Sequence, residues 1–405
     1  MNVLSLFDGM SCGQQALERA GIKVDNYYAS EIDKHAISIT QKNYPNTVQL
    51  GSVVNVDVDT LDKIDLLIGG SPCQSFSFAG KRKGMSTKDE IEILSLDQYL
   101  ILKEQNFEFE GQSYLFWEYM RILTDLRKLN PNVKFLLENV MMGEKWEKVL
   151  SKAIGVNPIE INSALVSAQN RRRLYWTNIG MKPSGLFGDL ESVIAQPKDR
   201  GILLKDILES EFDEKYFISQ KMIDGFLSHN KRHIEEKNQT GFNWKPTNGD
   251  KKANTLRANA ALCATDNSII VHNLMPRSST NGNGGSGHLT RNDGKTYCLD
   301  TGNTNAVEVR EVKQINECKE SGGQQPYQQN RVYDIEGITP ALCAHKSDLI
   351  INTSRIRRLT PTECERLQTV RDGYTEGVSD TQRYRMLGNG WTVEVIAHIF
   401  NYLNN

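Results

Sequence analysis

Short apolar runs alternate with amphipathic stretches through the first 180 residues, and this alternation constrains the fold most. Residues 3–7 and 24–29 are rich in apolar, aromatic or β-branched side chains, and helical spacing follows at 14–20 and 34–44. The pattern continues with apolar runs at 64–68 and 133–137 and helical stretches at 114–129 and 145–154. Strands that alternate with helices build a mostly parallel sheet covered by helices. The sequence therefore predicts an α/β fold with a Rossmann-like sheet.

The composition changes after about residue 180. Residues 280–305 are dominated by Gly, Asn, Ser and Thr, which favour turns and short strands over long helices. Helical spacing returns after residue 355. We therefore expect a smaller, β- and loop-rich domain to be inserted into the first one. The expected boundaries are 1–180 plus 383–405 for the first domain and 181–382 for the inserted domain.

Composition excludes several classes of protein. Hydrophobic residues make up 39% and charged residues 24% of the 405 positions, which argues against a disordered chain. The seven cysteines form no Cys-x-x-Cys pair, so we expect neither a disulfide framework nor a metal site. Neither a membrane span nor a secretory signal is indicated, and we expect a soluble, cytoplasmic protein. The 48 basic and 50 acidic residues nearly balance, so a nucleic acid would have to be bound by local basic patches.

A glycine-containing turn follows the first predicted strand and precedes the first helix. Residues 7–13 read Phe-Asp-Gly-Met-Ser-Cys-Gly, and glycine there lets a ligand approach the backbone at a helix N-terminus. Glu31 comes about 20 residues later, directly after the second strand, where a carboxylate can accept both hydroxyls of a ribose. A plain turn and a solvated carboxylate are the alternatives. Together the two features favour a ligand that contains ribose.

Two further strands are followed by side chains with catalytic potential. Cys73 lies in a glycine-entered loop after the third apolar run, and Glu138 follows the fourth. The carboxyl ends of parallel strands share one edge of the sheet, so both side chains are expected at one crevice. Arg171 and Arg173 precede a later apolar run and are candidates for the same crevice. The alternatives are a small buried thiol and a solvated basic face.

Taken in order, these motifs resemble those of the DNA (cytosine-5) methyltransferase family over nearly the whole chain. The resemblance lies in Phe7-x-Gly9, Pro72-Cys73-Gln74, Glu138-Asn139-Val140, Gln169-x-Arg171-x-Arg173, Arg358-Leu359-Thr360-Pro361, and Gly388-Asn389 with Val393. It implies the fold of S-adenosylmethionine-dependent methyltransferases with an inserted target-recognition domain. The implied catalytic residues are Cys73, Glu138, Arg171 and Arg173. The implied cofactor contacts are Phe7, Asp8, Gly9, Met10, Gly13, Glu31, Ile32, Ser52, Val53, Pro72 and Asn389. The family often has Asp where Ser52 stands here, so adenine recognition is expected to lean on the backbone.

The implied reaction transfers a methyl group from S-adenosylmethionine to carbon 5 of cytosine in a specific double-stranded DNA sequence. The Cys73 thiolate would add to C6 and make C5 nucleophilic, while Glu138 would relieve charge at N3. The base has to leave the duplex, because the thiol must approach above the ring. Two alternatives stay open: a catalytically idle DNA-binding module and an RNA cytosine-5 methyltransferase.

The resemblance also sets expectations for partners and for three segments. We expect a monomer that binds double-stranded DNA in the bacterial cytoplasm, associated with the nucleoid and with no membrane; a cognate restriction endonuclease stays an open question. Lys81, Arg82 and Lys83 are expected to contact phosphates, and residues 324–331 are candidate readers of base edges. Residues 86–112 exceed the usual length of that segment and predict an extra helical element.

Overall fold

The computed structural model describes residues 1–72, 85–184, 189–230, 232, 246, 249–258, 267–271 and 355–403. The chain divides into two compact units, Met1–Ile269 with Arg358–Asn405, and Ile270–Arg357. Cys73, residues 81–83 and residues 324–331 lie outside the described residues. The seven-stranded sheet and the site described below belong to the first unit.

Seven strands form one sheet in the order β3-β2-β1-β4-β5-β7-β6. They are β1 (Asn2–Leu6), β2 (Asn26–Ser30), β3 (Val48–Gln49), β4 (Leu66–Gly70), β5 (Lys134–Val140), β6 (Ile159–Asn162) and β7 (Arg172–Thr177). β1 to β5 are parallel to one another, whereas β7 is antiparallel to both β5 and β6. The strand order reverses between β1 and β4, which is where open sheets of this kind bind ligands. The expected mostly parallel α/β sheet is confirmed.

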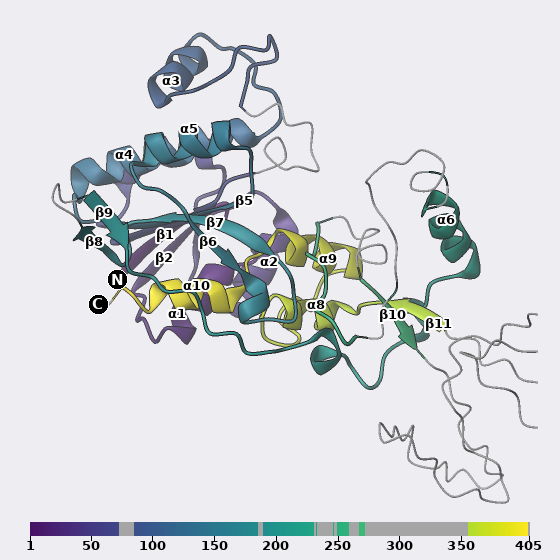
Figure 1. The fold of residues 1–405 in the computed structure, drawn as a ribbon. Helices are drawn as coiled ribbons and strands as arrows, with labels where there is room; N and C mark the ends of the chain where they lie inside the picture. The colour runs from purple at the N-terminus through teal and green to yellow at the C-terminus, as the bar shows by residue number, and fades with distance from the viewer. Residues whose placement is uncertain are drawn as a thin grey trace, which may run out of the picture. The chain divides into compact units, whose positions relative to one another are not determined.

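Helices cover both faces of this sheet. α4 (Phe116–Leu129) and α5 (Glu144–Ile154) lie over one face, and α1 (Cys12–Arg19) and α10 (Val393–Phe400) lie over the other (Figure 1). Further elements are α2 (Lys34–Asn43), α3 (Leu96–Glu104), α6 (Gln220–Asn230), α8 (Pro361–Leu367), α9 (Asp380–Asn389), the strand pair β8 (Met181–Ser184) and β9 (Asp189–Ser192), and the strand pair β10 (Ser268–Val271) and β11 (Arg355–Arg358). Among the described residues, no helix has the length and apolarity that crossing a membrane requires.

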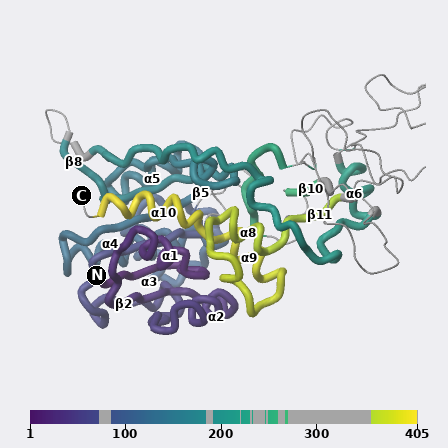
Figure 2. Tube along the Cα trace, turned by 90° about the horizontal axis from the view of Figure 1, so that it is seen from below, coloured from purple at the N-terminus to yellow at the C-terminus, as the bar shows by residue number. Residues whose placement is uncertain are grey.

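The core explains why the strands read as apolar runs. Successive side chains of a strand point to opposite faces, and here both faces are covered. Leu4 and Leu6 of β1 join a hydrophobic cluster with Trp117 of α4, while Val3 is buried on the opposite face. α10 packs against α1, so the last described helix returns to the beginning of the sheet (Figure 2).

One strand contains glycines that the sequence interpretation placed in a loop. β4 continues through Gly69 and Gly70, and Gly70 pairs with Glu138 of β5. Glycine usually weakens a strand, but a Cβ on Gly69 would lie only 3.1 Å from the Leu6 carbonyl oxygen and from the Tyr119 ring. The close approach of neighbouring backbone and ring therefore favours glycine here. Glu138 lies two residues before the end of β5, close to its expected position at the end of that strand.

Candidate active site

The turn between β1 and α1 has an uncommon backbone conformation. Phe7, Gly9 and Ser11 have φ angles of 57°, 58° and 60°, and left-handed geometry costs a non-glycine residue about 1–2 kcal/mol. Such conformations persist where surrounding contacts enforce them, frequently at ligand sites. A Cβ placed on Gly9 would meet no atom within 4 Å. The main chain of this turn therefore leaves room for a ligand.

Glu31 connects the ends of β1 and β2. Its Oε2 accepts a hydrogen bond from the Gly9 N–H (2.8 Å), and its Oε1 accepts from the N–H groups of Ile32 (2.7 Å) and Asp33 (2.8 Å). An ionised carboxylate has about four acceptor positions, so these three bonds do not exhaust it. The Ile32 side chain is 71% exposed. An acceptor and an exposed aliphatic side chain thus lie beside the open turn.

Three residues of the predicted cofactor site, Asp8, Met10 and Gly13, face the protein interior. The Asp8 carboxylate accepts hydrogen bonds from the hydroxyls of Tyr27 (2.8 Å) and Ser11. Met10 is buried, and a Cβ on Gly13 would lie 2.5 Å from the Ile68 side chain. These residues pack between the turn and the protein interior. Gly13 allows α1 to approach β4 closely. Their predicted contact with a cofactor would therefore have to come from the main chain.

The Asp8 carboxyl should make stability depend on pH. Burial raises its pKa to about 6, although hydrogen bonds from Ser11 and Tyr27 oppose the shift. The folded state then holds the proton more tightly than the unfolded chain, whose Asp pKa is about 4. As the pH rises from about 4 to 6, this group should therefore lower the free energy of unfolding by on the order of 3 kcal/mol. Asp8→Asn removes the charge, so the free energy of unfolding of the variant minus that of wild type should be larger at pH 7.5 than at pH 4. Urea unfolding at both pH values measures this, and an equal difference at both would contradict it.

Ser52 and Val53 lie in the loop after β3. The loop begins at Gly51, whose φ is 72° and whose carbonyl accepts a hydrogen bond from Ser30 Oγ (2.8 Å). Val53 is buried at the start of the 3-10 helix η1 (Val53–Asn55), and its carbonyl accepts from Arg121 Nη2 (3.3 Å). The loop is thus attached to β2 on one side and to α4 on the other.

Glu138 and Arg173 form an ion pair near the carboxyl ends of the parallel strands. Arg173 Nε lies 2.9 Å from Glu138 Oε1, and the two side chains are 14% and 11% exposed. The antiparallel register of β5 and β7 produces this contact, because it places Arg173 opposite Val140 and Tyr175 opposite Glu138. A carboxylate that remains partly accessible is therefore in charge contact with a guanidinium.

The position beside Glu138 is occupied by a glycine and an indole. A Cβ on Gly70 would lie 3.1 Å from Glu138 Oε2 and 2.9 Å from Trp391 Nε1. Gly70 therefore leaves the space in which the carboxylate and the indole lie. The sequence interpretation did not include Trp391, although it lies two residues after Asn389, within the motif that runs from Gly388 to Val393.

Arg171 holds main chain. It is buried, and its guanidinium donates to the carbonyls of Leu256 (3.0 Å), Gly388 (3.3 Å) and Gly390 (3.0 Å). A Cβ on Gly388 would lie 2.3 Å from the Arg257 carbonyl carbon, so the two chain segments approach closely. Arg171 thus connects these segments, whereas Arg173 forms the ion pair with Glu138. Asn389, the last residue of α9, is exposed.

The chain is anchored directly after β4. The side-chain amide of Asn139 donates to Ser71 Oγ (3.0 Å) and to the Ser71 carbonyl (3.3 Å), and both residues are buried. Pro72 is half-buried, and Cys73 itself lies outside the described residues. Asn139 therefore fixes the direction in which the chain leaves β4. The sequence interpretation quoted this residue within a motif but gave it no role.

The thiol of Cys12 is unsuited to nucleophilic chemistry. Cys12 is buried at the first position of α1, and burial raises the pKa of its thiol to about 12. Only the thiolate is a strong nucleophile. Cys12 should therefore stay protonated and unreactive at neutral pH.

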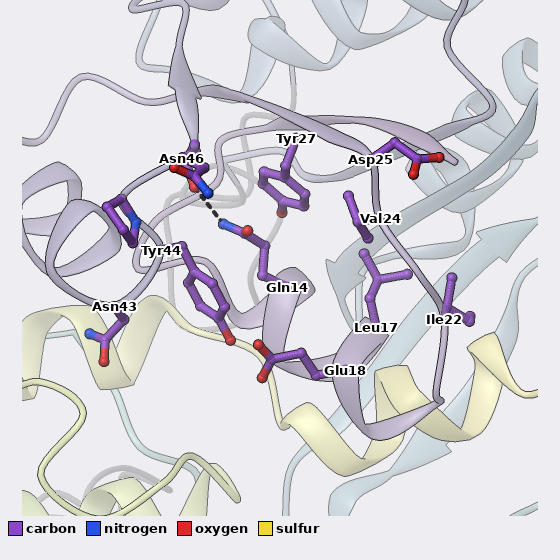
Figure 3. A pocket seen from close by; sticks show the side chains of 12 residues that line it. Gln14, Leu17, Glu18, Ile22, Val24, Asp25, Tyr27, Asn43, Tyr44 and Asn46 are labelled. Carbon is purple, nitrogen blue, oxygen red and sulfur yellow. Dashed lines mark hydrogen bonds between the residues drawn. The ribbon is translucent and has the colours of Figure 1, made fainter.

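A surface pocket of about 320 Å³ lies elsewhere on the sheet (Figure 3). It is lined by Gln14, Leu17, Glu18, Ile22, Val24, Asp25, Tyr27, Asn43, Tyr44, Pro45, Asn46 and Thr47. The residues that precede β2 and β3 border it, which places much of its wall toward the amino ends of these strands. None of the predicted site residues lines it. The candidate site is therefore the opposite edge, which carries Gly9, Glu31 and Glu138.

Comparisons with known proteins find methyltransferases that resemble this chain over nearly its whole length. The orphan methyltransferase M.SPRI of Bacillus phage SPR is 25% identical, and the alignment covers 100% of this chain and 97% of that protein. The type II methyltransferase M.HgiCI of Herpetosiphon aurantiacus is 26% identical over 96% of this chain and 94% of its own length.

Solved structures share the fold at lower identity. The Entamoeba histolytica methyltransferase EhMeth superposes with a TM-score of 0.55 at 15% identity, covering 100% of this chain and 97% of its own. A Spodoptera frugiperda DNMT2 variant gives 0.56 at 19% identity, covering 100% and 99%. The family model described as C-5 cytosine-specific DNA methylase matches residues 1–155 and 159–405. The chain belongs to the family of C-5 cytosine-specific DNA methylases.

Proposed function

We propose that this chain transfers a methyl group from S-adenosylmethionine to carbon 5 of a flipped-out cytosine in a specific double-stranded DNA sequence, through a covalent bond between Cys73 and C6. The observation that carries the proposal is the ion pair, at 2.9 Å, between Glu138 of β5 and Arg173 of β7. β5 is the neighbour of β4 in the sheet. The chain leaves β4 at this edge, and Cys73 follows three residues after Gly70. Membership of the methylase family supplies the class of reaction.

The residues at the ends of β1, β2 and β3 fit S-adenosylmethionine. Glu31 offers a carboxylate for ribose hydroxyls, Ile32 offers an exposed aliphatic side chain for a flat base, and Gly9 leaves open space above the turn. Ser52 and Val53 would add main-chain groups at the adenine end. When bound, the cofactor supplies an electrophilic methyl group.

The protein's own groups would activate the cytosine ring. The Cys73 thiolate adds to C6 and forms a carbon–sulfur bond, while Glu138 in its protonated form donates a hydrogen bond or a proton to N3. The Arg173 guanidinium lies against the Glu138 carboxyl as its ion-pair partner. The electron pair gained at C5 bonds to the methyl carbon, whose bond to the cofactor's sulfur would break, with S-adenosylhomocysteine as the leaving group. Loss of the C5 proton to a base, return of the N3 proton to Glu138 and departure of the thiolate then restore the aromatic ring and Cys73.

Glu31→Ala tests the cofactor site. Removal of a charged hydrogen-bond acceptor should weaken S-adenosylmethionine binding by roughly 10- to 100-fold, because such bonds contribute about 1.5–3 kcal/mol. Isothermal titration measures the affinity, and DNA affinity without cofactor should stay the same. Glu18→Ala is the matched control, since Glu18 is exposed and lines the pocket of Figure 3. Unchanged binding in Glu31→Ala, or equal weakening in Glu18→Ala, would contradict the assignment.

Several expectations stay predictions. They are the division into a catalytic domain (1–180 plus 383–405) and a recognition domain (181–382), the monomeric state, the association with the nucleoid in the cytoplasm, and a cognate restriction endonuclease. The two alternatives are an idle DNA-binding module, which would bind target DNA without product, and an RNA methyltransferase, which would modify RNA. Intact Glu138, Arg173 and Cys73 favour an active enzyme over the idle module.

A further inference from the structure

Residues 86–112, called the extra segment here, form a helix-containing insertion whose two ends are adjacent. Thr87 bridges Phe109 in antiparallel fashion, and α3 lies between them, which confirms the predicted extra helix. In the sequence the segment begins 13 residues after Cys73. It packs onto α4 through the buried ring of Tyr99.

The extra segment donates to a fully buried carboxylate. Glu118 of α4 is 0% exposed, and its Oε1 accepts from the Tyr99 hydroxyl (2.6 Å) and from Lys103 Nζ. Its Oε2 accepts from Arg121 Nε (2.7 Å). A buried carboxylate is costly unless it is paired and hydrogen-bonded. Two of the three donor groups in these bonds come from the extra segment, so α3 helps to satisfy Glu118.

Arg121 extends this network to the loop after β3. While its Nε binds Glu118, its Nη2 donates to the carbonyls of Val56 (3.1 Å) and Val53 (3.3 Å). Glu118 therefore fixes the plane of the guanidinium whose other edge holds residues 53–56. A continuous series of hydrogen bonds runs from α3 through Glu118 and Arg121 to this loop.

We propose that Tyr99, Lys103 and Glu118 are positioning residues, which hold the loop at residues 52–56 in the geometry that binds S-adenosylmethionine. The inference rests on the proposed function, because that loop forms part of the proposed cofactor site. The physical reason is the division of the two carboxylate oxygens: one is fixed by α3 and the other orients Arg121. Without the bonds to α3, the carboxylate can rotate, and Arg121 loses its fixed orientation toward the two carbonyls.

Lys103→Met tests the inference. Mutations within such a network typically change coupling by 0.5–2 kcal/mol, so the KM and Kd for S-adenosylmethionine should rise roughly 3- to 30-fold, while kcat at saturating cofactor changes less than twofold. Lys103→Arg should restore most of the affinity. Tyr99→Phe removes one hydroxyl with little risk to folding and should shift the affinity in the same direction, which keeps the test valid if Lys103→Met folds poorly.

The matched control is Lys88→Met. Lys88 lies in the same segment and pairs with Glu108, but both side chains are exposed, so the affinity should not change. Wild-type affinity in both Lys103→Met and Tyr99→Phe, even with a lowered melting temperature, would overturn the inference, as would equal weakening in Lys88→Met. Glu31→Ala in the same titration separates the two failures: if it alone weakens binding, the cofactor site stands and only this inference fails.

Discussion

Replacing Cys73 by serine is expected to abolish methyl transfer, with a loss on the order of 10⁴-fold or more, and to leave DNA binding largely intact. The thiolate forms the bond to C6, and a serine hydroxyl is a much poorer nucleophile at neutral pH. The Cys73 side chain contributes little to phosphate contacts, which carry most of the affinity for DNA. The measurement is transfer of labelled methyl groups to duplex DNA, alongside a binding titration.

A trapping experiment identifies the covalent step. Duplex DNA that contains 5-fluorocytosine cannot lose its C5 substituent, so wild type should form a stable adduct and Cys73→Ser should not. Cys364→Ser is the control, because Cys364 is buried in α8 and has no part in the proposed chemistry; it should form the adduct. A stable adduct in Cys73→Ser would overturn the assignment of the nucleophile.

Glu138→Gln is expected to lower the rate of methyl transfer by roughly 10²- to 10⁴-fold, the usual contribution of one general acid or base. The amide keeps the shape of the carboxyl group but cannot give up a proton to N3 in the same way. It also removes the ion pair with Arg173, which lies 2.9 Å away. Binding of S-adenosylmethionine should stay within a few-fold of wild type. Single-turnover kinetics at saturating cofactor and DNA measures the chemical step.

The structure offers a matched control for Glu138→Gln. Glu160 in β6 pairs with Arg172 in β7 at 2.8 Å, and both side chains are exposed. Glu160→Gln removes an ion pair from the neighbouring strands without touching the proposed site, and its rate should match that of wild type. A Glu138→Gln rate within a few-fold of wild type would assign Glu138 a structural role.

The sequence was sufficient for the order of elements but not for their ends. Strands that are buried on both faces leave apolar runs, and these identified the sheet. Gly69 and Gly70 looked like loop residues because the sequence does not show that Leu6 and Tyr119 crowd Gly69 from neighbouring elements. The antiparallel direction of β7 was likewise not predicted, because it depends on how the chain returns to the sheet.

The site was predicted as a set of residues but not as a set of contacts. The pairing of Glu138 with Arg173 depends on the register of β5 and β7, which sequence spacing does not give. Arg171 was expected beside them, yet its guanidinium binds carbonyls of a distant segment and of the loop after α9. Asp8 was expected to face the cofactor, yet its carboxylate lies under the turn with Tyr27.

The most direct test of the account is to identify the methylated nucleoside. Purified protein is incubated with labelled S-adenosylmethionine and either unmethylated duplex DNA or transfer RNA, and each product is digested to nucleosides and analysed by mass spectrometry. The account predicts 5-methyl-2′-deoxycytidine from the DNA, at positions that bisulfite sequencing then assigns to one sequence. A product found only in the RNA as 5-methylcytidine, or no methylated cytosine in either nucleic acid, would contradict it.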